Sequence, residues 1–310
     1  MMGRAFVKPA IPKRKAVIAR AALLTACLAL VAGCTASRPD LFGVGASRQE
    51  TLSFDVSGRP TLEIDTAYGE VTVVGVEGQT EILVEATFTS RGEHPESAAE
   101  HVERVRLFTE QDGDRVILQY RASDQDRDIR RYSGIGFSIT TPPDADVEIE
   151  TRLRPVTVEN IRGDVVIETS RDSVTAHDVS GSLAATTTDG LIEVVGASGD
   201  LTLRTTMSNI HLREIRGTVD AATTYSAIRF SGTFEGQGNR LKSKHGLLEV
   251  KVSADAKLDV TARTLHGTIS SALPVTGEQE TERWEVTLGG PSDNDLELIT
   301  DNAAIRIMEL

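Results

Sequence analysis

The 310-residue chain has few cysteines, few aromatic residues and no long hydrophobic run. Its only cysteines, Cys27 and Cys34, lie near the N-terminus, which excludes a disulfide-rich scaffold. Aromatic residues make up 4% of the chain, and only Tyr132, Tyr225 and Trp284 fall at expected loops or corners, which disfavours a lectin that stacks sugars on rings. The apolar run in the N-terminal segment has 13 residues, whereas a bilayer-spanning helix needs about 20. A multispanning membrane protein is therefore excluded.

Positive charge is also scarce, with 33 Lys and Arg against 46 Asp and Glu. Residues 1–33 hold six of the basic residues and no acidic one, so the chain from residue 34 onward has a net charge of −19 (27 basic against 46 acidic). A chain this acidic repels phosphate backbones, and we predict no nucleic-acid partner. The overall balance of 25% charged and 39% apolar residues is typical of one or two soluble domains.

The N-terminal segment has the order of an export signal: basic residues, an apolar run, and small residues before Cys34. The sequence LVAGC (30–34) resembles the lipobox of bacterial lipoproteins, in which a diacylglycerol is attached to the cysteine before cleavage. Cleavage would remove Cys27 and leave an unpaired Cys34, so we predict lipid attachment at Cys34 and a membrane contact through this lipid. The alternative is an ordinary secretory signal. In lipoproteins an Asp after the cysteine favours the inner membrane; here Thr35 implies the outer membrane, on either its periplasmic or its surface side.

From residue 146 onward the chain repeats every 18 residues. Within a row, the residues expected to point inward alternate at positions 2, 4 and 6 and again at 11 and 13, followed by position 16, which is strand geometry. The change of parity between the two runs requires two corners in every row. Glycine ends successive rows at Gly163, Gly181, Gly199 and Gly217. Further copies occupy 218–236 and 61–78, looser ones 238–255 and 257–274, and the segment 296–307 closes the chain.

A threonine recurs at position 6 of the rows. In a solenoid, equivalent residues stack from rung to rung, so we expect the threonines to form a hydrogen-bonded ladder. A hairpin meander has no reason to repeat one residue type at this position. We therefore predict an all-β fold: a single-stranded β-solenoid, right-handed as is usual, with 18-residue rungs about 4.8 Å apart and a rod of roughly 40 Å. The column comprises Thr66, Thr151, Thr169, Thr187, Thr205, Thr223 and Thr300, with Ser243 in one row.

Residues 79–145 interrupt the repeats with a different pattern. It predicts strands at 81–90, 115–121 and 136–142 and a helix beginning at Pro95. Because the open end of a solenoid invites edge-to-edge aggregation, we expect this strand-helix-strand module to cover one end. The predicted organisation is a signal peptide at 1–33, a flexible tether at 34–50, the first rung and capping module at 51–145, and solenoid repeats at 146–310.

With these rows in view, the chain from about residue 50 onward resembles the bacterial β-strand-repeat putative adhesin lipoproteins of unknown function, related to the head GIN-domain adhesin group. The resemblance rests on VEIETRLRPVTVENIRG (147–163), on LTLRTTMSNIHLREIRG (201–217), on the entry segment ITTPPDADVEIET (139–151) and on the lipobox. It implies the repeat fold, and no catalytic residue comes with it.

Motifs for catalysis or metal binding are missing from the sequence. There is no Gly-x-Ser-x-Gly, P-loop or Rossmann glycine pattern, and the six histidines form no ligand pair. The run Asp124, Asp126, Asp128 begins like a calcium loop but has Ile129 and Ile135 where such a loop needs Gly and Glu. We therefore predict no catalytic residue, no metal and no cofactor.

Positions 12 and 14 of the rows point outward and bring several basic residues onto one face, diluted by Glu193 and Glu249. We predict a lipid-anchored, non-enzymatic protein of the cell envelope with a binding, adhesin-like or scaffolding role toward an unknown protein or glycan. The alternatives are a polysaccharide-binding or polysaccharide-active β-helix that uses this face, and a periplasmic sensor or partner of a membrane regulator. The candidate ligand face consists of His211, Arg213, Arg229 and Lys251.

Overall fold

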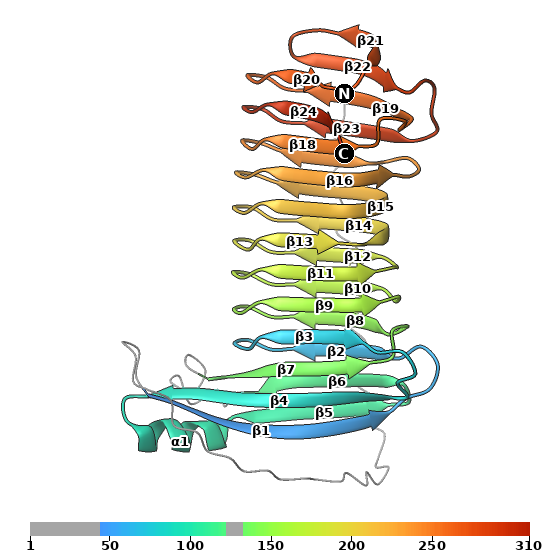
Figure 1. The fold of residues 1–310 in the computed structure, drawn as a ribbon. Coiled ribbons are helices and arrows are strands. Elements are labelled where there is room, and N and C mark those ends of the chain that lie inside the picture. Colours follow the sequence, from blue (N-terminus) through green and yellow to red (C-terminus); the bar gives the residue numbers. More distant parts are fainter. Residues whose placement is uncertain (1–43, 122–132) are drawn as a thin grey trace, which may run out of the picture.

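The computed structural model describes residues 44–121 and 133–310 as a rod of stacked strand pairs (Figure 1). Each rung has a first strand and a second strand joined by a turn, and each kind forms its own parallel stack. From the base upward, the first strands are β2 (Thr61–Asp65), β8 (Asp146–Glu150), β10 (Val165–Glu168), β12 (Leu183–Thr186), β14 (Ser198–Arg204), the C-terminal part of β15 (Ile210–Thr223), β17 (Arg240–Ser243), β23 (Asp295–Ile299) and β19 (Leu258–Arg263). The second strands are β3 (Val71–Gly75), β9 (Val156–Ile161), β11 (Val174–Val179), β13 (Ile192–Val195), the N-terminal part of β15, β16 (Ile228–Phe234), β18 (Leu248–Val252), β24 (Ile305–Glu309) and β20 (Ile269–Ser271).

The repeat appears directly in the pairing of the first strands. Val147 pairs with Val165, and the register continues to Leu183, Leu201 and Val219, each 18 residues further along the chain. The prediction of an all-β, solenoid-like repeat fold is confirmed, and the handedness of the coil stays a prediction.

The core lies between the two stacks, where the alternating apolar residues of every strand point inward. Along the second strands, Val156, Val174, Ile192, Ile210 and Ile228 follow one another in register and are all fully buried. Each such side chain contributes about 1.5–3 kcal/mol by leaving water. Since one continuous core joins the rungs, each rung depends on its neighbours for burial.

Spatial order and chain order differ at both ends of the rod (Figure 1). Near the C-terminus, Leu298 of β23 pairs with Leu241 on one side and with Ala262 on the other, so the last rung of the sequence is not the last rung of the rod. The hairpin of β21 (Val275–Gln279) and β22 (Arg283–Leu288) lies beyond β19 at the end of the rod, with β22 antiparallel to β19. At the base, the rung of β2 and β3 likewise lies between β8/β9 and the strands β6 (Arg115–Arg121) and β7 (Gly134–Thr141).

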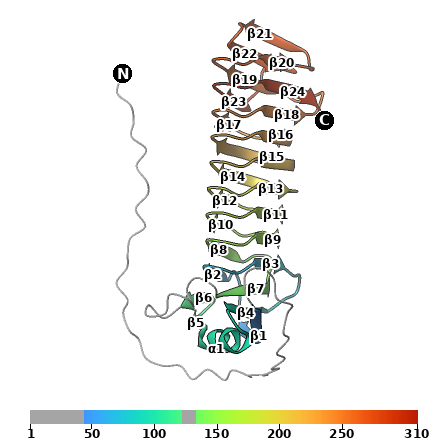
Figure 2. The same cartoon turned by 90° about the vertical axis from the view of Figure 1, so that its left-hand side faces the viewer.

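The base module is completed by β1 (Val44–Asp55), β4 (Glu81–Gly92), α1 (Pro95–Arg104) and β5 (Arg106–Asp112). β4 pairs antiparallel with β1 and β7, and α1 packs on β1 and β4 with Ala98 and Val102 buried. The view in Figure 2 places this module at the lower end of the rod. Sequence analysis missed β5, and its tether boundary at residue 50 is wrong because β1 begins at Val44. The first half of β1, VGASRQ, lacks the apolar alternation that identifies a strand, and its backbone pairing with β4 holds it in place.

The predicted signal peptide, Cys34 and the acidic run Asp124–Asp128 lie outside the described residues. Within the described chain, no helix is long and apolar enough to cross a membrane.

The threonine column is buried, but its hydroxyls do not bond one another as we predicted. Six of the eight donate instead to a backbone carbonyl of the adjacent rung, as Thr205 does to Gly190 (3.3 Å) and Thr223 to Ser208 (3.1 Å). A rung spacing of about 4.8 Å is too long for a direct oxygen-to-oxygen hydrogen bond, whereas the turn carbonyl is within reach. Thr169 has no hydrogen-bond partner among the described residues.

Candidate functional site

The four residues predicted as a ligand face lie on one strand stack, and two of its cations contact neighbouring side chains of the rod. His211 lies in register between Glu193 and Arg229, and Arg229 Nη1 is 2.9 Å from His211 Nε2. Because a guanidinium only donates, the imidazole accepts here. Partial burial and the neighbouring Arg229 also lower the pKa of His211. Both the contact and the burial favour the neutral imidazole.

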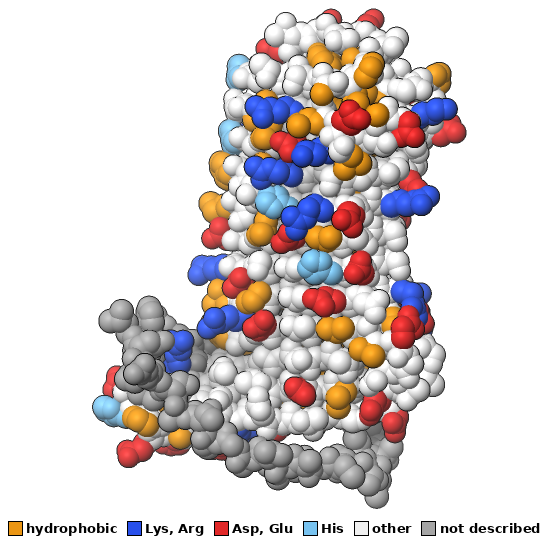
Figure 3. Space-filling model, viewed as in Figure 1, with side chains coloured by type: hydrophobic (Ala, Val, Ile, Leu, Met, Phe, Trp, Pro, Cys, Tyr) orange, Lys and Arg blue, Asp and Glu red, His pale blue; other side chains and the backbone are white. Residues whose placement is uncertain are grey.

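The other two predicted residues are less closely joined. Arg213 forms an ion pair with Glu193, and Lys251 lies one rung beyond Arg229, in register with Ser231. The visible face in Figure 3 accordingly shows basic, acidic and histidine side chains intermingled. The role of His211, Arg213, Arg229 and Lys251 as a ligand face stays a prediction.

An open groove, which sequence analysis missed, lies where the first strands of four neighbouring rungs end. Its volume is about 660 Å³. Ala222 stands in register between Arg204 and Lys242, so a short side chain separates two long ones and leaves the surface hollow. We call this feature the lysine groove; it is lined by Arg204, Thr205, Thr206, Ala222, Thr223, Thr224, Lys242, Lys244, Ile299 and Asp301.

The lysine groove is positively charged on a chain that is otherwise strongly acidic. Arg204 is held by the Asp220 carboxylate and also donates to the Asp220 carbonyl at 2.6 Å. Lys242 and Lys244 have no ion-pair partner among residues 44–121 and 133–310, and Asp301 is the one acidic residue of the lining. The two free ammonium groups give the groove an unsatisfied preference for anions.

Aromatic rings stand in the turns beside the groove. Tyr225 and His245, from adjacent rungs, are stacked with ring centroids 5.3 Å apart and planes at 12°. The His245 Nδ1 atom is 2.9 Å from Asn302 Nδ2, so the amide donates and fixes the imidazole. Tyr225 is 58% exposed. The sequence placed Tyr225 at a corner, but nothing in its pattern indicated that its ring would stack on His245.

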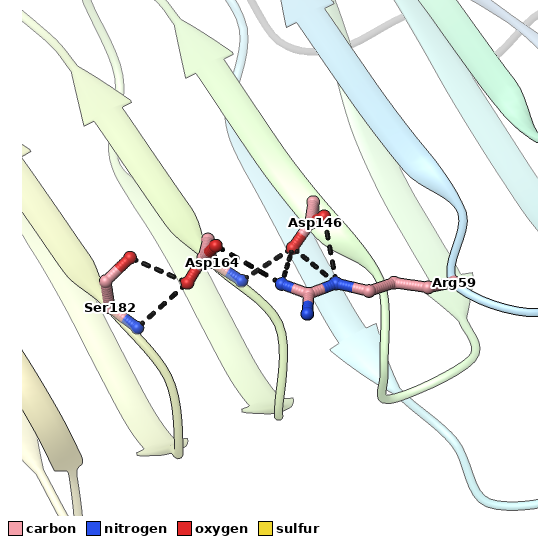
Figure 4. A network of polar contacts seen from close by, with 4 residues as sticks. All are labelled: Arg59, Asp146, Asp164 and Ser182. Carbon is pink, nitrogen blue, oxygen red and sulfur yellow. Dashed lines mark hydrogen bonds and ion pairs between the residues drawn. The ribbon is translucent and has the colours of Figure 1, made fainter.

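A second polar cluster, at the glycine corners near the base, is structural (Figure 4). Arg59 donates from Nε to both carboxylate oxygens of Asp146 (3.0 and 2.9 Å) and from Nη2 to Asp164 at 3.2 Å. Asp164 in turn accepts from Ser182. Since every carboxylate here is engaged by the chain itself, the cluster ties rungs together. Among the residues described, no group of three or more His, Cys, Asp or Glu is placed to hold a metal ion.

Comparison with known proteins identifies the family. The model of the Toastrack DUF4097 family matches residues 61–308, from the first rung into the last strand. The chain belongs to the Toastrack family. The Toastrack match includes both faces of the rod and the whole lysine groove, and the family predicted from the repeats is confirmed.

Solved structures similar to this Toastrack chain share only 11% identity with it. They include a putative adhesin from Bacteroides fragilis NCTC 9343 (TM-score 0.38, covering 85% of this chain and 97% of that one) and a putative cell adhesion protein from Clostridium sporogenes ATCC 15579 (TM-score 0.30, 85% and 100%). A putative adhesin from Parabacteroides merdae ATCC 43184 has a TM-score of 0.28 (84% and 96%). Likeness at this level carries no argument about function. No curated protein matches the chain.

Proposed function

We propose that this Toastrack protein is a lipid-anchored, non-enzymatic binding protein of the bacterial cell envelope, with an adhesin-like role. The observation that carries the proposal is the pair Lys242 and Lys244, which face the lysine groove without ion-pair partners among the described residues. Two unpaired cations in a groove on an otherwise acidic rod attract a ligand or partner of negative charge.

The geometry of the rod suits display of this groove. The lipobox would place the lipid on Cys34, ten residues before β1 begins at Val44, at the base of the rod. Six rung steps separate β2 from β17, so Lys242 lies roughly 30 Å along the rod from the first rung. A rod anchored at its base would hold the groove well clear of the headgroups.

Anchoring and display are tested together by protease shaving of intact cells that carry the native protein or Cys34→Ala. We expect the native protein in the membrane fraction and cleaved on intact cells, and Cys34→Ala released from the membrane. A Cys34→Ala protein that stays in the membrane contradicts the lipid anchor. Protection of the native protein until the outer membrane is broken contradicts display at the cell surface and favours a periplasmic partner.

Binding is tested by cross-linking the full-length protein in cells through its lysines. Replacing both Lys242 and Lys244 by Gln is expected to abolish the adducts, whereas Lys257→Gln, an exposed lysine outside the groove lining, is the matched control. Equal loss with Lys257→Gln contradicts the proposed groove. Glycan turnover that disappears with Arg213→Ala contradicts the non-enzymatic role.

A further inference from the structure

The lining of the lysine groove combines cationic groups, hydroxyls and one carboxylate. Arg204, Lys242 and Lys244 supply positive charge, and Thr206 and Thr224 add hydroxyls that both donate and accept. Asp301, at the far side, bounds the cationic stretch. The groove therefore suits a ligand that carries negative charge and hydroxyl groups together.

Arg204 and Lys242 follow the axis of the rod, whereas Lys242 and Lys244 lie in one rung. Arg204, Ala222 and Lys242 occupy one register column in three consecutive rungs, so the two charged residues stand about 9–10 Å apart. A polymer lying along the rod would pass Arg204 and, two rungs further on, the pair Lys242 and Lys244.

Exposed rings lie in the turns next to the lining. Tyr225 follows Thr224 and stacks on His245, which follows Lys244, and Met207, 55% exposed, lies in the preceding turn. Aromatic rings bind the C–H faces of sugars, whereas inorganic anions gain nothing from such a contact. The exposed rings of Tyr225 and His245 therefore favour a saccharide over an inorganic polyanion.

The electrostatics also disfavour a densely charged partner. The chain from residue 34 onward carries a net charge of −19, which repels a polymer with a charge on every phosphate. A groove with two free lysines matches a polymer with widely spaced charges better. We infer that the lysine groove binds a linear anionic polysaccharide, with its carboxylates on Lys242 and Lys244 and a sugar face on Tyr225. This inference rests on the proposed binding function and specifies its ligand class.

The test is titration of the purified full-length protein in detergent with tetragalacturonic acid, its fully methyl-esterified form and inorganic polyphosphate, followed by calorimetry. The ester keeps the sugar skeleton and removes the charge. We expect the acid to bind at least about tenfold more tightly than the ester, and Lys242→Gln and Lys244→Gln each to weaken it about tenfold. Tyr225→Ala should weaken the acid about fivefold and leave any polyphosphate binding unchanged.

Lys257→Gln, an exposed lysine outside the groove lining, is the matched control, and unchanged thermal unfolding checks that the exposed variants fold. Equal affinity for acid and ester, or an equal loss with Lys257→Gln, overturns the inference. Tighter binding of polyphosphate with no effect of Tyr225→Ala also overturns it and leaves a general anion site. If none of the three probes binds while cross-links through Lys242 and Lys244 persist in cells, the glycan inference fails and the proposed binding function stands.

Discussion

Asp164 and Ser182 occupy the same corner in successive rungs, and the Asp164 carboxylate accepts both the backbone N–H (3.1 Å) and the hydroxyl (2.7 Å) of Ser182. Asp146 makes the same backbone bond to Asp164 at 2.8 Å. Each carboxylate thus gives the next rung's corner amide a fixed acceptor, in the way that a capping residue satisfies the first amides of a helix. Figure 4 shows that Arg59 closes this chain of contacts at the base.

The Asp164 contact makes stability depend on pH. The bonds from Ser182 lower the pKa of Asp164, so its contribution is present above the unfolded pKa of about 3.9 and is lost as the pH falls through the lower folded value. Because water screens this half-exposed carboxylate, Asp164→Asn should cost up to about 1 kcal/mol at pH 7 and less at pH 3, measured by urea denaturation. Asp200→Asn, at the same corner of a later rung, is the control. An equal cost at both pH values would contradict the assignment.

The threonine column offers a comparison between two equally buried hydroxyls. Thr223 donates to the Ser208 carbonyl, whereas Thr169 has no hydrogen-bond partner among the described residues. Thr223→Val should cost about 1 kcal/mol or more because it leaves that carbonyl without its donor, while Thr169→Val should be neutral or stabilising. Thermal unfolding of the two variants measures the difference. An equal loss of stability in the two variants would mean that hydrogen bonding by the hydroxyls is not the reason for threonine at this position.

Periodicity predicted what a rung is, but not which rungs are neighbours. The rows around Val165, Leu183 and Leu201 keep an unbroken 18-residue register, so the sequence places each beside the next. The row that contains Leu298 has the same pattern as any other, and nothing in it indicates insertion between Leu241 and Ala262. That choice depends on how β21 and β22 cover the end, which involves contacts distant in the sequence.

The candidate sites divide in the same way. His211 and Arg229 were predictable as neighbours because their rows are in strict register. The lysine groove was not, since Lys242 follows a row with inserted residues and pairs through a register of 20 between Asp220 and Arg240. Asp301 reaches the groove only because its strand is inserted out of order. The 18-residue repeat therefore could not predict the groove, because the groove is formed by rows that depart from the repeat.

The glycine corner predicts a steric test. A Cβ at Gly181 would lie 2.4 Å from the Gly163 carbonyl oxygen, and one at Gly217 2.1 Å from that of Gly199, so neighbouring rungs approach too closely for a side chain. Gly181→Ala should destabilise the rod by about 1–3 kcal/mol in urea denaturation. Gly45→Ala is the control, because its Cβ would meet nothing closer than 3.9 Å. A harmless Gly181→Ala would show that the rungs can separate at this corner.

The outward face of the lowest first strands concentrates negative charge and predicts a stabilising change. Partial burial and the neighbours Glu63 and Glu168 raise the pKa of Glu148, so the folded state holds its proton more tightly than the unfolded chain does. Ionised Glu148 therefore costs stability at pH 7, and the cost disappears as the pH falls below the unfolded pKa of about 4.3. Glu148→Gln should stabilise the protein by up to about 1 kcal/mol at pH 7 and by nothing measurable at pH 3.5, in urea titrations at both values.

The control is Glu249→Gln, in register between Arg229 and Arg306. It should destabilise the protein at pH 7 because it removes a negative charge flanked by cations. An equal gain from Glu148→Gln at both pH values would mean that packing, and not charge, limits this face.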